Sequence, residues 1–589
     1  MGKNIEIADI FDRIADALEF KGENFFKIAA YRKASRVLRE YHGDIEKNMK
    51  AGTLSEIDGI GKGMAEKIQE YFLTGSITKY KETISDIPEG LLELFNIPNL
   101  GPKTLYLIYK DLGIKTLEDL EKALEDGRIA SLPGMGSKKA ANIMKGMALY
   151  KSGKARTPLG IALPAAEEII APLKKITKKV SIAGSLRRMK ETIGDIDILA
   201  TGDKSAEIIE NFVSQRSVKD ILARGNTKAS VLIEPRNLQV DLRVVKENSY
   251  GAALLYFTGS KTHNVKIRRL AKEKNLKLNE YGVFKGRKKI AGENEEEIYR
   301  TLGMKWIPPE LREDRGEIEA AMEGKLPNII EQNDITGDLH VHSNYSDGVN
   351  DIRTLALAAR KMGYRYIGIC DHSKTSRIAG GLDEQSLNRR DEEIDRIQEE
   401  MHGIRIFKGM EVDILSDGRL DYSDTVLEKL DFVIAAVHQG FAKNVTHRMK
   451  TAMENPFVDI IAHPTGRLLS GREGYVMNLE EIIEHAARKN VALEINAAYD
   501  RLDLDDANIL RAKEFRARFV IGTDAHDTEM LKQMKLGIGM ARRGWLEKKD
   551  ILNARVRCNR FIQFHHFFSV GDKTWILLIQ EDIFSDRED

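Results

Sequence analysis

The sequence has few of the features that mark secreted and membrane proteins. It contains two cysteines, Cys370 and Cys558, so no framework of disulfides supports the fold, as is usual for a protein in a reducing compartment. No apolar run is long enough to cross a bilayer, and we expect no signal peptide. These absences predict a cytoplasmic protein that does not act on a membrane.

The chain also lacks a large net charge of either sign. Its 92 Lys and Arg residues balance 91 Asp and Glu residues, which leaves a formal charge of +1. The whole molecule is therefore not a polycation, and any binding to nucleic acid must depend on local basic patches. With 589 residues and 42% hydrophobic content, the chain exceeds what one core supports, and we expect several globular domains.

Acidic residues interrupt two apolar runs that are typical of buried strands. Asp195 and Asp197 flank Ile196 at the start of one run, and alternation along a strand turns both carboxylates the same way. Asp241 is the acidic residue of a second β-branched run, 239–245. Three acids on adjacent strands suit a pair of Mg²⁺ (or Mn²⁺) ions and the transfer of a phosphoryl or nucleotidyl group.

A tight turn with two arginines precedes the first acidic pair. An Asp-x-Asp alone is usually a solvated feature of a loop or strand end, but Gly-Ser-x-Arg-Arg before it and a distant strand Asp after it form a more specific pattern. The pattern resembles the nucleotidyltransferase palm of family X DNA polymerases, the group that contains DNA polymerase beta. The resemblance implies deoxynucleoside triphosphates as substrates and a site made of Gly184, Ser185, Arg188, Asp195, Asp197 and Asp241.

Three glycine turns in the first 140 residues each lie between an apolar residue and an amphipathic helix. Glycine permits a positive φ in such a turn, and the N–H groups at the start of the next helix can face a phosphate. The repetition favours sequence-independent binding of the DNA backbone over ordinary helix caps. The expected DNA contacts are Gly59, Gly61, Gly63, Gly101, Lys103, Gly134, Gly136 and Lys138.

The first of these turns and its helix also resemble the small lyase domain of DNA polymerase beta. The resemblance implies that Lys67 occupies the position of the lysine whose amine forms a Schiff base with a 5'-deoxyribose phosphate. It places Tyr31, Lys27 and Lys79 in the phosphate pocket, whereas Gly63 stands where that family has a further lysine. The alternative is that Lys67 is a helix-surface lysine that binds DNA, and the sequence leaves both readings open.

The run that follows the palm resembles the thumb of the same family. The resemblance implies that two adjacent aromatic residues form a steric gate at the sugar, that an asparagine reaches the minor-groove edge of the incoming base, and that an arginine faces the template. These nucleotide-binding residues, with one glycine, are Tyr256, Phe257, Gly259, Asn264 and Arg268. Gln239 and Lys261 depart from the family pattern, which has an arginine near the attacking hydroxyl and an acid over the base. These departures concern fidelity and rate.

Histidines and acids follow apolar runs throughout the last third of the chain. His340 and His342 share one face of a strand, which suits bidentate capture of a transition metal. A strand, a ligand and a helix, repeated, predict a (β/α) barrel with its site at the strand ends. One strand-end histidine is more often a core residue, but six so placed among thirteen in the chain favour a metal centre.

This set of residues resembles the polymerase and histidinol phosphatase (PHP) domain. The resemblance implies a distorted (β/α)7 barrel, a three-metal cluster of Mn²⁺ or Zn²⁺, and hydrolysis of phosphodiesters as a 3'-5' exonuclease. The nine implied ligands are His340, His342, Asp347, His372, Glu411, His438, His463, Asp524 and His526.

These patterns together predict a multidomain α/β protein. The expected parts are a lyase-like helical domain (1–85), a fingers-like helix-hairpin-helix domain (86–155), a palm with a mixed sheet (156–250), an α/β thumb (251–318), a linker (319–335), the PHP domain (336–555) and an atypical tail without an assigned role (556–589).

We expect a monomeric repair DNA polymerase that fills gaps in base excision repair, acts on gapped or primed DNA, and carries a metal-dependent 3'-5' exonuclease. One alternative is a phosphoesterase that acts on nucleotides and has a vestigial polymerase module. A second is a DNA-binding scaffold without chemistry. Both sets of metal-binding residues are complete, which favours the polymerase.

Overall fold

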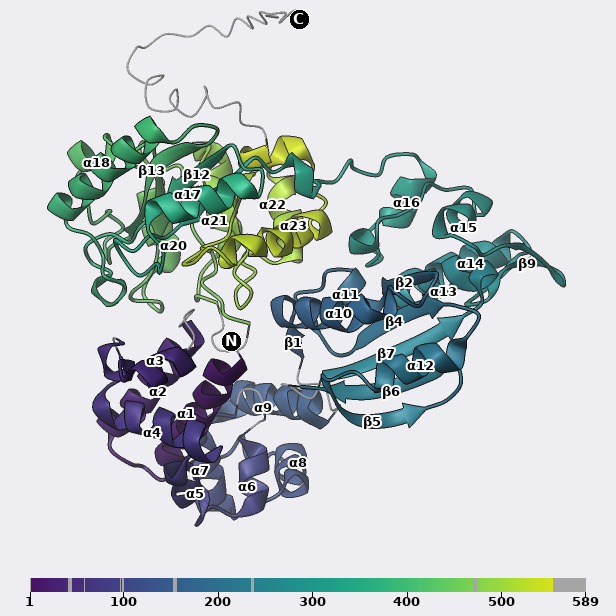
Figure 1. The fold of residues 1–589 in the computed structure, drawn as a ribbon, viewed down its shortest axis with the longest axis horizontal. Coiled ribbons are helices and arrows are strands. Elements are labelled where there is room, and N and C mark those ends of the chain that lie inside the picture. The colour runs from purple at the N-terminus through teal and green to yellow at the C-terminus, as the bar shows by residue number, and fades with distance from the viewer. Residues whose placement is uncertain are drawn as a thin grey trace, which may run out of the picture. The chain divides into compact units, whose positions relative to one another are not determined.

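A computed structural model of the chain (Figure 1) describes residues 2–40, 45–57, 59–95, 97, 100–151, 156–234, 238–469 and 474–554. The tail at 556–589 lies outside these residues. The chain divides into two compact units, residues 1–325 and 326–589, which are described separately. Among the described residues, no helix combines the length and the apolar character that crossing a bilayer requires.

The described residues between 2 and 151 form helices and the turns that join them, as the periodic apolar residues predict. Two apolar cores hold these helices together, one containing Phe11, Leu38 and Ile68, the other containing Phe20 and Ile108. The elements are α1 (Gly2–Phe20), α2 (Phe25–Glu40), α3 (Ile45–Ala51), η1 (Leu54–Glu56), α4 (Lys62–Thr74), α5 (Thr78–Ile84), α6 (Glu89–Leu94), α7 (Pro102–Leu112), α8 (Leu117–Glu125) and α9 (Gly136–Lys151).

The glycine turns reach the predicted helix starts by two backbone routes. Gly59, Gly134 and Gly136 have positive φ, as expected, and a Cβ at Gly59 would lie 2.6 Å from Val37 Cγ2. The expectation of positive φ is wrong for Gly61 (φ −69°), which is the N-cap of α4. Gly101 is likewise an extended N-cap, before α7. In the first turn the chain reverses at Gly59, so Gly61 adopts the backbone of an ordinary N-cap.

A five-stranded mixed sheet follows the helices. Its order is β2-β4-β7-β6-β5, and β4 and β7 are parallel while the other pairs are antiparallel. In β7 buried residues alternate with half-buried ones, so one face packs on the core. The elements are β1 (Thr157–Pro158), α10 (Leu159–Leu173), β2 (Lys179–Ile182), α11 (Gly184–Arg187), β3 (Thr192–Ile193), β4 (Ile196–Thr201), α12 (Ser205–Val213), β5 (Val218–Arg224), β6 (Lys228–Ile233) and β7 (Leu238–Val245).

The remainder of the first unit combines helices with a three-stranded sheet of order β10-β9-β8. Buried His263 lies 2.6 Å from the Glu317 carboxylate and 2.9 Å from the Tyr299 hydroxyl, which ties α16 to α14 and α15. Residues 319–322, expected in the linker, belong to α16. The elements are η2 (Glu247–Ser249), α13 (Tyr250–Thr258), α14 (Lys261–Glu273), β8 (Lys277–Asn279), β9 (Gly282–Lys285), β10 (Lys288–Ala291), α15 (Glu295–Thr301), η3 (Pro309–Leu311) and α16 (Glu317–Met322).

A buried carboxylate joins the palm to the thumb. Glu295 is 4% exposed and forms paired hydrogen bonds with Arg312 (2.6 and 3.0 Å) and with Arg187 (2.8 and 2.8 Å). Burial alone would raise the pKa of Glu295, but the two guanidiniums hold it well below its usual range. This ionised carboxylate therefore fixes α15 against α11.

The second unit is a parallel sheet of seven strands in sequence order, from β11 to β17. A bridge between Val341 and Ala525, beyond β17, brings the first and last strands together, so the predicted (β/α)7 barrel is confirmed. Its strands are buried apolar runs, as is typical of parallel sheets. The strands are β11 (Gly337–Val341), β12 (Tyr366–Ile369), β13 (Arg405–Asp413), β14 (Phe432–Ala436), β15 (Ile460–Ile461), β16 (Ala492–Asn496) and β17 (Arg518–Gly522).

Helices alternate with these strands and surround them in Figure 1. They are α17 (Ile352–Lys361), α18 (Glu384–Glu400), α19 (Asp424–Leu427), α20 (Val445–Ala452), α21 (Leu479–Lys489), α22 (Asp506–Glu514) and α23 (Met534–Arg543). Short 3-10 turns complete the unit: η4 (Gln332–Asp334), η5 (Arg377–Ala379), η6 (Met530–Gln533), η7 (Lys548–Asp550) and η8 (Leu552–Ala554).

The Glu295 cluster generates a prediction about stability. Glu295→Ala leaves the fully buried Arg312 without its carboxylate, which should destabilise the first unit by about 3–5 kcal/mol. Thermal unfolding followed by calorimetry should show a lower midpoint for that unit. Glu296→Ala, at an exposed position of the same helix turn, is the control, and equal midpoints for the two variants would contradict the role of Glu295.

Candidate active sites

The palm acids lie where β4 and β7 run side by side. The parallel register places Asp197 of β4 directly opposite Asp241 of β7, and both side chains line one small pocket. Asp195 precedes β4, two residues before Asp197, while Ile196 and Ile198 are buried on the other face. The structure therefore places two of the three predicted acids together and the third beside them at the start of the strand.

Close packing fixes the position of these acids. Gly184 has a φ of +63°, and a Cβ there would lie 2.3 Å from Asp197 Oδ2, so a side chain cannot be accommodated without moving the carboxylate. The Ala183 N–H donates to the Asp197 carbonyl (2.8 Å). Gln239 Nε2 donates to Asp241 Oδ1 (3.1 Å), so the residue that departs from the family pattern orients a catalytic candidate.

The two arginines after this turn have different partners. Arg187 binds the Glu295 carboxylate and the Thr258 hydroxyl (2.7 Å). Arg188, the predicted phosphate ligand, donates from Nε to Glu313 Oε1 (3.0 Å) and from Nη1 to the Thr258 carbonyl. The guanidinium expected to bind phosphate is thus engaged by a carboxylate in this structure.

Small residues border Arg188 on both sides. Ser185 is half-buried in α11, in the turn that carries the arginine. Gly259 has a φ of +69°, and a Cβ there would lie 3.1 Å from Arg188 Nη1. Gly259 therefore leaves the guanidinium the room that a larger residue would take.

The predicted gate residues form an aromatic corner at the end of α13. The Tyr256 and Phe257 rings meet edge to face at 5.1 Å between centroids, and the Arg243 guanidinium lies 4.6 Å from the Phe257 ring centroid. Asn264 Nδ2 donates to the Tyr256 carbonyl (2.7 Å), and Arg268 Nε donates to the Asn264 carbonyl (3.3 Å). Tyr256 is 39% exposed, so it can meet a ligand.

In the helical region one lyase-like position, Lys67, lies beside Tyr31. The Lys67 amine lies 5.9 Å from the Tyr31 ring centroid, and Lys27 (3.1 Å) and Lys79 (3.3 Å) each pair with a glutamate carboxylate. Burial and the charge of Glu82 raise the pKa of Tyr31 to about 12. The phenol therefore stays neutral and can donate a hydrogen bond at neutral pH.

The predicted DNA-binding turns have an open backbone. Apart from the adjoining residues and the backbone of the same helix, no atom of the described residues lies within 4 Å of the place where a Cβ would stand at Gly61, Gly63, Gly101, Gly134 or Gly136. The Lys103 side chain is 81% exposed, with its amine 3.7 Å from Glu19. The side chain of Lys138 lies outside the described part of the chain.

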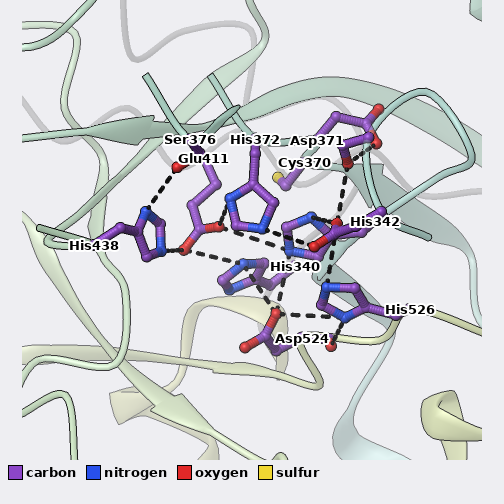
Figure 2. Close-up of polar contacts among 12 residues, drawn as sticks. His340, His342, Cys370, Asp371, His372, Ser376, Glu411, His438, Asp524 and His526 are labelled. Atoms are coloured by element: carbon purple, nitrogen blue, oxygen red, sulfur yellow. Dashed lines mark hydrogen bonds and ion pairs between the residues drawn. The ribbon is translucent and has the colours of Figure 1, made fainter. Parts of the chain in front are cut away.

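All nine predicted ligands of the barrel gather at its mouth, and most of them appear in Figure 2. Eight fall into three groups, within each of which one ligand atom per residue lies within 4.8 Å of the others. The groups are His342, Asp347, His372 and His526; His340, His342 and Asp524; and His372, Glu411 and His438. The ninth residue, His463, places Nε2 3.0 Å from Glu411 Oε1.

Glu411 is the centre of this cluster. It is 1% exposed, and burial alone would raise its pKa, but the surrounding imidazoles hold that pKa well below the usual range. The histidines with a ring nitrogen within 4 Å of its carboxylate are His340, His342, His372, His438 and His463.

Several buried ligand atoms make no hydrogen bond within the described residues. They include His340 Nε2, both ring nitrogens of His342, and His463 Nδ1. Leaving a buried polar atom without a hydrogen-bond partner destabilises the fold by about 1–3 kcal/mol. A cluster of such atoms therefore indicates a site that binds a further group, such as a metal ion. Imidazole nitrogens mixed with carboxylate oxygens fit divalent cations such as Mn²⁺ or Zn²⁺.

A second layer of carboxylates orients these histidines. His340 Nδ1 lies 2.6 Å from Glu494 Oε1, and the other oxygen of Glu494 accepts the His463 backbone N–H (2.7 Å). The Asp413 carboxylate forms the equivalent hydrogen bond with His438 Nδ1. Because Nδ1 is occupied in both rings, Nε2 is the nitrogen directed at the cluster.

The sequence patterns do not predict Glu494 or Arg501 as members of the site. Glu494 alternates with apolar residues in β16, the barrel strand to which no ligand was assigned, and this alternation was the available signal. Arg501 has Nε 3.7 Å from Asp524 Oδ2, and its buried Nη1 has no hydrogen-bond partner among the described residues. A positive charge therefore stands at the edge of the ligand cluster.

Comparison with known families gives four matches along the chain. Residues 2–77 match a helix-hairpin-helix domain and residues 91–148 match a SAM-like helix-hairpin-helix tandem. Residues 253–313 match the DNA polymerase beta thumb. Residues 338–498 match the PHP domain. These matches fall on the helical region, the thumb and the barrel.

Whole proteins give similar results. The chain is 40% identical over 563 residues to the DNA polymerase/3'-5' exonuclease PolX of Bacillus subtilis (strain 168), covering 93% of this chain and 97% of that protein. It is 26% identical over 342 residues to DNA polymerase lambda of Rattus norvegicus, covering 53% and 56% of the two chains. A probable phosphatase of Syntrophotalea carbinolica is 32% identical over 202 residues, covering 32% of this chain and 79% of that protein.

The contact between Gly184 and Asp197 generates a prediction about the palm. Gly184→Ala should push the Asp197 carboxylate from its place opposite Asp241, and a displacement of about 1 Å at such a site costs about 100-fold in rate. Primer extension under single-turnover conditions measures the loss. Gly324→Ala is the control: it introduces the same backbone strain at a positive φ, but the new Cβ would meet no atom of another described residue within 4 Å. Full activity in both variants would contradict the packing role of Gly184.

The second carboxylate layer generates a prediction about metal affinity. Glu494→Gln keeps the size of the side chain but removes the charge behind His340, and changes of this kind weaken metal binding about 10- to 100-fold. Titration of the metal-free protein with Mn²⁺ in a calorimeter measures the change at the barrel. Glu484→Gln, an exposed position on α21, should bind as the unchanged protein does, and unaltered affinity in Glu494→Gln would refute the role of Glu494.

Proposed function

The chain belongs to the family X DNA polymerases that carry a C-terminal PHP domain, and from this premise we propose that it fills gaps in DNA during repair and trims 3' ends. The observation that carries the polymerase half is the pairing of Asp197 with Asp241 across two parallel strands. The observation that supports the exonuclease is the group of nine ligand residues, Glu411 among them, at the barrel mouth.

In the palm, we propose that Asp195, Asp197 and Asp241 hold two Mg²⁺ ions, or Mn²⁺ in their place. Bound ions of this kind lower the barrier to attack by the 3'-hydroxyl and neutralise the triphosphate. Asp197 and Asp241 can share these ions because they lie opposite each other on adjacent strands, and Asp195 is two residues before Asp197. Gln239 keeps Asp241 in its orientation through its amide hydrogen bond.

The residues around the palm select and position the nucleotide. Ser185 and Arg188 bind the outer phosphates, where a guanidinium forms charge-assisted hydrogen bonds. Gly259 leaves space beside them. Tyr256 and Phe257 lie against the sugar, and their rigid edge-to-face packing suits exclusion of a 2'-hydroxyl.

The helix-hairpin-helix turns hold the DNA without reading its sequence. Their open glycine backbones allow a phosphate to approach the N–H groups at the following helix starts. We propose Asn264 and Arg268 as contacts at the base pair being formed. Since phosphate contacts dominate such binding, affinity for gapped DNA should fall as salt increases.

At the barrel mouth, we propose that the nine ligands hold a cluster of three Mn²⁺ or Zn²⁺ ions. Such a cluster activates water and binds a phosphodiester for hydrolysis. The buried histidine nitrogens that have no hydrogen-bond partner among the residues described support this proposal. Arg501 lies beside Asp524, and its Nη1 has no hydrogen-bond partner in the described part of the chain. It places a positive charge where a non-bridging phosphate oxygen of the DNA can bind.

Three further properties belong to the same proposal. Lys67 is the candidate amine for a 5'-deoxyribose phosphate lyase, supported by its place beside the neutral Tyr31 phenol; binding of DNA by Lys67 is the alternative. We propose that the protein acts as a monomer in the cytoplasm. The paired acids of the palm weigh against a vestigial polymerase attached to a phosphoesterase, and the two metal-binding sets weigh against a scaffold.

Two substitutions test whether the two activities reside in the two units. Asp197→Ala should abolish extension into a short 5'-phosphorylated gap with Mg²⁺ while the digestion of single strands with Mn²⁺ continues. His340→Ala should show the reverse. Each variant is the control for the other, and full gap filling by Asp197→Ala would overturn the assignment of the palm.

A further inference from the structure

The ion pair between Arg188 and Glu313 joins the palm turn to the end of the thumb. The Arg188 Nε and a Glu313 oxygen are 3.0 Å apart, and the two side chains are 12% and 13% exposed. Arg188 Nη1 donates to the Thr258 carbonyl on the same side. A partly buried ion pair is less screened by water and salt than one on the surface.

The position of Glu313 is set by its rigid neighbour. Arg312 is fully buried and its guanidinium is held by Glu295 and by the Ile307 carbonyl (2.9 Å). The Arg312 carbonyl accepts the Ser260 N–H (3.0 Å). Because the residue before it is anchored at both its side chain and its backbone, Glu313 is held at Arg188.

We propose that Glu313 competes with the nucleotide for Arg188 and thereby sets the affinity of the polymerase for deoxynucleoside triphosphates. This inference rests on the proposed role of Arg188 as a phosphate ligand. A carboxylate and a phosphate oxygen both bind a guanidinium by charge-assisted hydrogen bonds. The triphosphate must therefore displace Glu313 or approach against its negative charge, and either route weakens binding.

The competition acts on binding and not on the chemical step. Glu313 is a positioning residue, since it pairs with Arg188, and Asp197 and Asp241 lie on other elements, β4 and β7. Removal of its charge should therefore lower KM for the nucleotide and leave kcat nearly unchanged. A residue that only supported the fold would lower kcat or stability instead.

Steady-state gap filling with the full chain provides the test. In Glu313→Gln we expect KM for the nucleotide to fall about fivefold, on the scale of one partly buried ion pair, with kcat within about twofold. Glu313→Asp should restore a KM near that of the unchanged protein. Binding of dATP to the protein on a dideoxy-terminated gap, followed by fluorescence, should show the same fivefold change without turnover.

Two controls separate this inference from the function on which it rests. Asp314→Asn removes the neighbouring charge, which pairs with Lys266 (2.9 Å), and should leave KM unchanged. Arg188→Ala should raise KM about tenfold or more. If Arg188→Ala raises KM but neither Glu313→Gln nor Glu313→Ala lowers it, the competition is refuted and the function stands. If Arg188→Ala leaves KM unchanged, the phosphate role of Arg188 fails and the inference fails with it.

Discussion

Parallel pairing of neighbouring strands is the constraint on which both candidate sites depend. In the palm it sets Asp197 opposite Asp241. In the barrel it sets His372 opposite Glu411. Paired parallel strands hold opposite residues side by side, so residues far apart in sequence meet there. A slip of one residue in either register would turn these side chains to the opposite face.

Burial gives these groupings their electrostatic character. Glu295 stays ionised inside the protein because two guanidiniums face it, and Glu411 does so because imidazoles surround it. In the group around Glu295, the carboxylate and both guanidiniums are hydrogen-bonded to one another. The group around Glu411 contains buried nitrogen atoms that make no hydrogen bond among the described residues. That difference distinguishes a structural cluster from one that binds metal ions.

The sequence predicted what local patterns encode. Alternation of acids with apolar residues identified Asp197 and Asp241 as neighbours on adjacent strands, and strand-end histidines identified the barrel. The support of His340 by Glu494 spans 154 residues, and the pair of Arg188 with Glu313 spans 125. No local pattern specifies such partners, because they depend on how separate elements pack. For the same reason the sequence could not show that Arg188 is already occupied by a carboxylate.

The most direct test of the central claim is to locate bound metal in crystals of the protein grown with Mn²⁺, gapped DNA and a non-hydrolysable nucleotide. Anomalous scattering at the manganese edge should show density shared by Asp197 and Asp241, and three peaks among the ligands around Glu411. Density absent between those two aspartates, or a barrel mouth without any bound metal, would contradict the account.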